Sequence, residues 1–201
     1  MKRFKIVFSM LLILMTMAIM QPAAAQARHK PRKVRVVKVN HVRVVKAHPH
    51  VFKRAHVRYA ALPRWGTVVA TYPAAAVLVR FGGSPFYFYN GIYYAPRQNN
   101  YVIVRPARGV RIRTLPVGYR RILVGPRPYF YYYGTFYVQA GSRNEYIVTD
   151  PPEGAIVDAL PDGYEIKTIN GNEYYELDGV YYAEVDASDI DGGIGYQVVK
   201  I

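Results

Sequence analysis

Cysteine is absent from all 201 residues of the chain. This absence excludes disulfide bonds, thiolate metal sites, a cysteine nucleophile and a lipid-anchored cysteine after a leader. The fold must therefore be stabilised by burial of apolar side chains alone. The hydrophobic content of 51% is sufficient for a core of ordinary size.

Long hydrophobic runs are also scarce, since the only one is "IVFSMLLILMTMAIM" at 6–20. It follows the basic start "MKRFK" and precedes small residues around Ala25 and Ala27, which is the order typical of a secretory signal peptide. The run is shorter than the roughly 20 residues of a spanning helix, although an uncleaved anchor is the alternative. We expect a signal peptide at 1–27 and an exported protein, in the periplasm or cell envelope or secreted, with no transmembrane segment after cleavage.

Acidic residues are missing from 28–144, which contains 22 Lys or Arg, whereas 145–201 contains all 13 Asp and Glu. Residues 28–63 form a basic, valine-rich segment of low complexity that includes all five histidines. Valine disfavours helix and like charges resist close packing, so we expect an extended arm that is either a solvated spacer or a binding segment. The candidate contacts to a polyanion are Arg32, Lys33, Arg35, Lys38, Arg43 and Lys46.

Three repeats follow the arm, at 64–106, 107–151 and 152–201. Each has a glycine seven residues before a proline, and that proline lies 18 residues before a second glycine. The first glycines are Gly66, Gly109 and Gly154, the prolines are Pro73, Pro116 and Pro161, and the second glycines are Gly91, Gly134 and Gly179. Recurrence at both spacings indicates a repeat architecture. The short alternating segments predict an all-β fold of small antiparallel units, SH3-like or open barrels.

An aromatic hairpin recurs in every repeat, as "FYFYNGIYYAP", "YFYYYGTFYV" and "YYELDGVYYAEV". Asn90-Gly91 and Asp178-Gly179 suit a two-residue type I′ turn, in which both central residues have positive φ. Tyr133-Gly134 departs from this pattern, which predicts a longer or bulged second turn.

A two-residue turn also predicts which side chains share a face of the third hairpin. Tyr175, Leu177, Val180 and Tyr182 then lie on one face, with Tyr174, Glu176, Tyr181 and Ala183 on the other, wetter one. The first two repeats lack an acid on the second face and present aromatic rings instead, which are either covered or available to a ligand. These rings are Phe86, Phe88, Tyr93, Tyr129, Tyr131 and Phe136.

Charges of opposite sign occupy matching positions in the second and third repeats. Arg113 corresponds to Asp158, and Arg120 corresponds to Glu165. Either each repeat has an independently solvated surface, or a basic face of one unit meets an acidic face of another. We expect Arg113, Arg120, Asp158 and Glu165 to contribute to such inter-repeat charge pairs, within one chain or head to tail between chains.

Catalytic and metal chemistry are poorly supported. The histidines lie far from every carboxylate in the sequence, and no nucleophile has a nearby base. Twelve Lys or Arg in 28–64 oppose metal binding by the histidines. We expect no enzyme activity, no catalytic residue, no metal site and no cofactor.

The third repeat carries the pattern P-P-x-G-A-x-V-x-x-L-P-x-G-Y, then N-G-x-x-Y-Y-x-x-x-G-V-Y-Y, then G-Y-x-V-V. This pattern resembles an uncharacterised family of exported bacterial proteins, catalogued as a domain of unknown function. The G-x-x-V-x-x-L-P-x-G run is also similar to bacterial SH3-like domains, whose members often bind cell-wall peptides. The resemblance implies export and an all-β fold, and it implies no site.

These observations predict a non-enzymatic, envelope-associated protein whose arm and first two repeats bind an anionic surface or polymer. Lipopolysaccharide, lipid headgroups or an acidic glycan would serve as the partner, whereas export argues against nucleic acid. The alternative is a cell-wall or protein-binding module that acts through the aromatic strand faces and self-associates head to tail.

Overall fold

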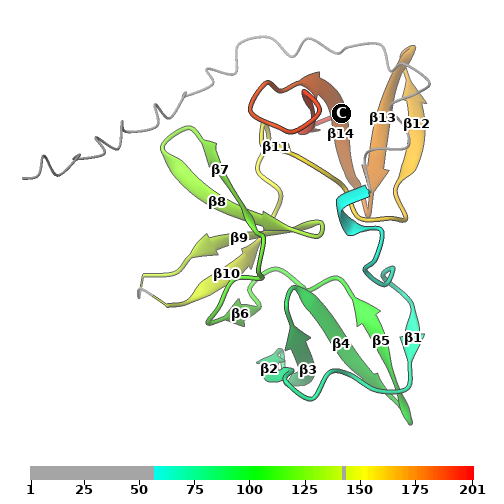
Figure 1. The fold of residues 1–201 in the computed structure, drawn as a ribbon, viewed down its shortest axis with the longest axis vertical. Helices are drawn as coiled ribbons and strands as arrows, with labels where there is room; N and C mark the ends of the chain where they lie inside the picture. Colours follow the sequence, from blue (N-terminus) through cyan, green and yellow to red (C-terminus); the bar gives the residue numbers. More distant parts are fainter. Residues whose placement is uncertain (1–56, 142–143) are drawn as a thin grey trace, which may run out of the picture. The chain divides into compact units, whose positions relative to one another are not determined.

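The computed structural model describes residues 57–141 and 144–201. In these ranges it contains one short 3₁₀ helix, η1 (Val57–Tyr59), and fifteen β-strands in three five-stranded antiparallel sheets. The sheets follow one another along the chain (Figure 1). The predicted all-β fold of three small antiparallel units is confirmed.

The first sheet has the strand order β1-β5-β4-β3-β2. Its strands are β1 (Val68–Val69), β2 (Val77–Phe81), β3 (Ser84–Tyr89), β4 (Ile92–Arg97) and β5 (Asn100–Val104). The last four strands form a meander, and β1 pairs with β5, so β1 and β2 are the edges of an open sheet.

The other two sheets repeat this topology, with orders β6-β10-β9-β8-β7 and β11-β15-β14-β13-β12. The second consists of β6 (Arg111–Ile112), β7 (Arg120–Val124), β8 (Arg127–Tyr132), β9 (Thr135–Gln139) and β10 (Tyr146–Thr149). The third consists of β11 (Ile156–Val157), β12 (Glu165–Ile169), β13 (Asn172–Leu177), β14 (Val180–Asp186) and β15 (Ile194–Val199). The strands of each sheet come from a single repeat.

The aromatic hairpins all use two-residue turns. The predicted pairs in the first and third repeats have positive φ at both residues, 42° and 89° for Asn90-Gly91 and 51° and 80° for Asp178-Gly179. The prediction of a longer or bulged second turn was wrong, because Tyr132 pairs directly with Thr135 and Tyr133 adopts a φ of 46°.

Tertiary contacts explain why a tyrosine occupies this position. The Tyr133 side chain is buried, its hydroxyl donates a hydrogen bond to the Pro63 carbonyl oxygen, and its ring packs edge-on against Tyr59 and Trp65. Burial of a large aromatic ring contributes more than the cost of one residue at positive φ.

The predicted faces of the third hairpin are confirmed by its register. Tyr175 pairs with Tyr182 and Leu177 pairs with Val180, so these four residues share one face. Three of them are buried, whereas Glu176 on the opposite face is partly exposed.

Consecutive repeats contact each other at equivalent points. Pro116 of the second repeat lies 3.1 Å from the Cβ position that Gly91 lacks, and Pro161 of the third lies 3.0 Å from that of Gly134. Gly179, at the corresponding turn of the third repeat, has open space at its Cβ position. The first and second repeats therefore each receive the proline of the next repeat, whereas the turn of the third repeat receives no proline and is contacted at Asp178 by Arg105.

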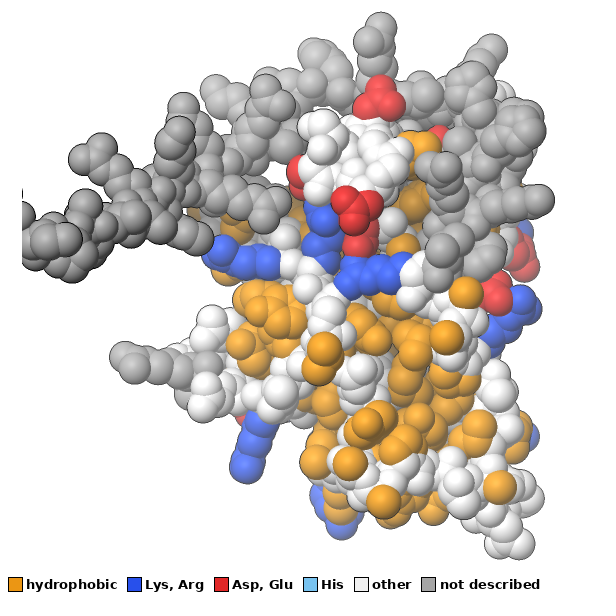
Figure 2. Space-filling model, in the orientation of Figure 1, with side chains coloured by type: hydrophobic (Ala, Val, Ile, Leu, Met, Phe, Trp, Pro, Cys, Tyr) orange, Lys and Arg blue, Asp and Glu red, His pale blue; other side chains and the backbone are white. Residues whose placement is uncertain are grey.

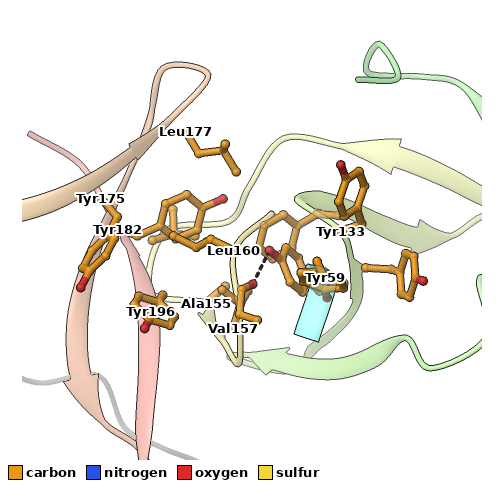
Figure 3. Close-up of a cluster of buried hydrophobic side chains, with 14 of the residues drawn as sticks. Tyr59, Tyr133, Ala155, Val157, Leu160, Tyr175, Leu177, Tyr182 and Tyr196 are labelled. Carbon is orange, nitrogen blue, oxygen red and sulfur yellow. Dashed lines mark hydrogen bonds between the residues drawn. The ribbon is translucent and has the colours of Figure 1, made fainter. Parts of the chain in front are cut away.

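The folded body begins before the repeat boundary expected at Arg64. Tyr59 is only 1% exposed, and it belongs to a buried cluster that includes residues of all three repeats (Figure 3). Residues 57–63, assigned from the sequence to the basic arm, therefore pack against the sheets, because this stretch supplies an aromatic side chain to the core.

Candidate functional site

The six arm residues expected to contact a polyanion are Arg32, Lys33, Arg35, Lys38, Arg43 and Lys46, and they lie outside the described residues. The signal peptide expected at 1–27 lies outside them too. The role of the arm stays a prediction. The candidate surfaces that the structure describes are the charged side chains and aromatic faces of the three repeats.

Ion pairs join the acidic third repeat to basic residues that precede it. Arg58 pairs with Asp158, Arg64 with Asp162, Arg105 with Asp178 at 2.6 Å, and Arg120 with Asp189 at 2.7 Å. These pairs are partly exposed, so each contributes roughly 0–1 kcal/mol, but together they fix which surfaces of the repeats face one another. The segregation of charge in the sequence thus supports contacts within the chain.

The four residues expected to contribute to inter-repeat pairs differ in the partners that the structure gives them. Arg120 of the second repeat bonds Asp189 of the third, and Asp158 bonds Arg58, which precedes the first repeat. Glu165 pairs within its own strand with Lys167, whose ammonium group lowers the pKa of the Glu165 carboxyl group. Arg113 forms no ion pair among the described residues. Equivalent positions do not meet because Arg113 faces the first repeat whereas Asp158 faces the second.

Five arginines of the first two repeats remain exposed and form no ion pair within 57–141 and 144–201. They are Arg80, Arg97, Arg113, Arg121 and Arg127. Unpaired cations on a protein surface attract anions, and the range of this attraction shortens as ionic strength rises. These five are the basic side chains of the folded body that remain available to an anionic partner.

The aromatic face proposed from the sequence is largely used inside the protein. Phe88 and Tyr93 are 7% and 1% exposed and cluster with Val110, Ile112 and Phe130 of the second repeat. Tyr131 and Phe136 are 0% and 1% exposed and contact the third repeat. Phe86 and Tyr129 are the two members that keep intermediate exposure. Most of this face therefore forms the interfaces between repeats.

A hydrogen bond crosses the interface between the second and third repeats. The Tyr131 hydroxyl donates to the Ala159 carbonyl oxygen at 2.7 Å. Burial raises the pKa of Tyr131, of Tyr137 and of Tyr182, so these phenols stay protonated at neutral pH, and the Tyr131 hydroxyl keeps the proton that it donates to Ala159.

Neither a metal centre nor a membrane-spanning helix appears in the described part of the chain. No three His, Asp or Glu side chains there are grouped as metal ligands would be. No helix there has the length and apolar character needed to cross a bilayer. The one buried carboxylate, Glu184, accepts a hydrogen bond of 3.1 Å from the Tyr175 hydroxyl, which suits a structural role.

Sequence reasoning missed the segment at 57–65. Arg58 bonds Asp158 and the Gly118 carbonyl oxygen, Tyr59 packs against Tyr132 and Tyr133, and Trp65 covers Gly134. The available signal was the aromatic pair itself, because Tyr59 is the only tyrosine and Trp65 the only tryptophan near the end of a basic, aliphatic arm.

Comparison with known proteins gives a family and no activity. No curated protein matches the chain. No solved structure matches it either. The model of a family of unknown function, DUF6515, matches residues 42–201, which covers the three repeats and part of the arm. The chain therefore belongs to this family, DUF6515, as the resemblance of its third repeat indicated.

Proposed function

We propose that this protein is a non-enzymatic, exported protein of the bacterial cell envelope that attaches to an anionic surface. Its basic arm makes the main contact, through Arg32, Lys33, Arg35, Lys38, Arg43 and Lys46. The unpaired arginines of the first two repeats add to it. The partner is a polyanion exposed in the envelope, such as lipopolysaccharide, phospholipid headgroups or an acidic glycan.

The observation that carries this proposal is the uneven neutralisation of charge. All 13 acids lie in 145–201, and ion pairs with basic residues engage several of them inside the chain. The arm has no acid of its own, and Arg80, Arg97, Arg113, Arg121 and Arg127 have no acidic partner in the described residues. A surface with uncompensated positive charge attracts anionic polymers and lipids.

Binding to vesicles tests the arm directly. The mature chain is mixed with vesicles of neutral phospholipid or of neutral phospholipid containing an anionic lipid, and the bound fraction is measured by sedimentation. We expect selective binding to the anionic vesicles. Replacing the six arm residues with Gln should reduce the affinity by at least about tenfold, since each cation near an anionic surface contributes about 1 kcal/mol.

A charge-conserving variant is the matched control. Replacing Arg32, Arg35 and Arg43 with Lys keeps the charge and the composition of the arm nearly constant, so binding should be close to that of the unaltered chain. Equal binding by the six-residue Gln variant and the unaltered chain would exclude the arm from the proposed function.

The alternative, a cell-wall or protein-binding module, now rests on fewer aromatic residues. Tyr131 and Phe136 are buried, so their substitution would perturb folding and would not report on binding. Phe86 and Tyr129 are partly exposed and provide the appropriate variants. Binding to cell-wall material that resists high salt and is lost on changing Phe86 or Tyr129 to Ala would favour this alternative.

A further inference from the structure

A groove of about 710 Å³ lies between the first and second repeats. It is lined by the edge strand β2 and the end of β3 on one side, and by residues 111–117 of the second repeat on the other. Its floor includes Phe88 and Ile112, which are buried, and its rim includes Val77, Leu78 and Val117, which are 56%, 48% and 82% exposed. The volume falls in the range of about 300–1,000 Å³ typical of ligand sites.

Exposed apolar side chains are concentrated around this part of the molecule. Four of the ten large hydrophobic residues that are exposed in the described chain line the groove, namely Val77, Leu78, Tyr89 and Val117. Figure 2 shows hydrophobic side chains gathered over the region where Figure 1 draws the first sheet. An apolar concentration of this kind marks an interaction site more often than a randomly scattered exposed residue does.

The groove has an exact counterpart one repeat further along, and there the site is filled. Between the second and third repeats, Arg58 bonds the Gly118 carbonyl oxygen and the Asp158 carboxylate. Tyr59 packs edge-on against Tyr132 and Tyr133, at centroid distances of 5.6 and 5.5 Å. The segment 57–64 of the chain itself is therefore the occupant of the second site.

The repeat offsets map these four partners onto the lining of the groove. Gly118, Tyr132, Tyr133 and Asp158 correspond to Ala75, Tyr89, Asn90 and Arg113, respectively. All four of the corresponding residues line the groove. The two sites are thus built from the same positions of consecutive repeats.

The charges at these positions differ in a way that indicates which kind of occupant the groove would accept. Asp158, which pairs with Arg58, is replaced by Arg113, which has no ion-pair partner in the described chain. Asp162, which pairs with Arg64, is replaced by Val117, which is apolar and exposed. An occupant of the groove therefore needs an acid where the chain has Arg58 and an apolar side chain where it has Arg64.

The packing around Gly91 also shows where the groove ends. Trp65 covers Gly134 at the filled site, whereas the place over Gly91 is already taken by Tyr132 of the second repeat. The occupant of the groove therefore corresponds to residues 57–64 and ends before the position of Trp65.

We propose that the groove binds a short peptide segment of another protein in which an acidic residue directly precedes an aromatic one. The aromatic ring packs beside Tyr89, as Tyr59 packs beside Tyr132, and the carboxylate pairs with Arg113. The apolar residue that follows contacts Val117. The edge strand β2 and the exposed side chains of Val77 and Leu78 cover the remaining surface of the peptide.

A fluorescently labelled octapeptide tests this site in the mature chain. The probe has the sequence of 57–64 with Arg58→Asp and Arg64→Leu, Val-Asp-Tyr-Ala-Ala-Leu-Pro-Leu, and binding is measured by fluorescence anisotropy. The matched control peptide keeps the natural sequence, Val-Arg-Tyr-Ala-Ala-Leu-Pro-Arg. We expect saturable binding of the probe and at least about tenfold weaker binding of the control, because its two cations face Arg113 and Val117.

Reversing the charge of the protein supplies the decisive comparison. Arg113→Asp should weaken binding of the probe by about tenfold or more and strengthen binding of the natural-sequence peptide, because the acid of the filled site is then recreated. Arg113→Ala should weaken binding of the probe without strengthening binding of the natural-sequence peptide. Arg127→Asp changes the same charge at an exposed position outside the groove, and it should leave both affinities nearly unchanged.

Two results would overturn the proposal. One is the absence of probe binding at millimolar concentration to a chain whose circular dichroism shows it to be folded. The other is binding that Arg113→Asp and Arg127→Asp weaken equally, or that survives replacement of the probe's tyrosine by alanine, since either shows nonspecific attraction of an acidic peptide.

Discussion

Tyr131 of the second repeat donates a 2.7 Å hydrogen bond to the carbonyl oxygen of Ala159 in the third, and both residues are buried. The bond joins β8 of the second sheet to the loop between β11 and β12 of the third repeat. It shows that the repeats are assembled through specific polar contacts in addition to apolar packing.

Replacing Tyr131 with Phe should lower the free energy of unfolding by about 1–3 kcal/mol, because the Ala159 carbonyl group remains buried without this donor. The ring itself should be tolerated, since Phe88 occupies the same position of the first repeat. Chemical denaturation of the two proteins measures the difference. Tyr89→Phe, at a residue that is 43% exposed, is the control and should change stability by less than about 0.5 kcal/mol. Equal effects of the two substitutions would show that the hydrogen bond contributes nothing specific.

The hairpin glycines provide a matched pair that tests the interface between repeats. Gly134→Ala would place a Cβ 2.6 Å from Trp65 and 3.0 Å from Pro161, whereas Gly179→Ala would meet open space. Both residues have positive φ, 74° and 80°, so the backbone cost of about 1 kcal/mol is similar. We expect Gly134→Ala to be more destabilising by about 1–3 kcal/mol, as for overpacked cores, in thermal or chemical unfolding. Indistinguishable unfolding curves would mean that the turn of the second repeat is not packed as described.

Residues 57–63, at the end of the arm, form part of the folded body, and substitution of Tyr59 tests their packing. Its side chain is 1% exposed and contacts Tyr132 and Tyr133. Tyr59→Ala should reduce stability by about 3–5 kcal/mol, the usual cost of removing a buried aromatic ring. A variant that begins at residue 64 should show a comparable loss of stability, whereas a variant that begins at residue 57 should not. Full stability after removal of 57–63 would contradict the packing of this segment.

Alkaline pH should destabilise the protein because many of its tyrosines are buried. Burial raises the pKa of Tyr133 to about 12 and raises those of Tyr59 and Tyr175 as well. The folded state thus holds these protons more tightly than the unfolded state, in which the tyrosine pKa is about 10. Stability is fully present below that value and falls as the pH rises above it.

The measurement is a series of denaturant unfolding curves from about pH 8 to about pH 11, with tyrosinate absorbance recorded in parallel. Midpoints should be nearly constant up to about pH 9.5 and then decrease, with buried tyrosines ionising only as the chain unfolds. Ionisation of all tyrosines near pH 10 without unfolding would contradict their burial.

The repeat and its strand topology could be predicted because local rules specify them. Asn90-Gly91 and Asp178-Gly179 favour the type I′ turn intrinsically, and this turn fixes which side chains share a face. The same rules failed at Tyr133-Gly134, where contacts with Tyr59, Trp65 and Pro63 outweigh the local preference of tyrosine. Those contacts join segments about 70 residues apart, which no local pattern reveals.

For the candidate sites too, the sequence predicts some features, and others depend on contacts between distant segments. Segregation of charge was visible in the sequence, but the partners of Asp158 and Arg120 depend on how the repeats pack. The groove beside Arg113 also becomes visible only by comparison with its filled counterpart, because its residues come from two repeats. Residue spacing shows which positions are equivalent, and the folded structure shows that the segment 57–64 fills the equivalent site.

The most direct test of the proposed attachment to an anionic surface is the salt dependence of that binding. The chain without residues 1–27 and a variant that also lacks 28–56, which keeps Tyr59 in place, are titrated with anionic vesicles from about 20 to about 500 mM salt, a range over which the Debye length falls several-fold. The account predicts tight binding at low salt that decreases steeply as salt rises, together with a much weaker and flatter response of the variant. Binding that persists at high salt and is unaffected by loss of 28–56 would contradict the account and assign the function to the folded repeats.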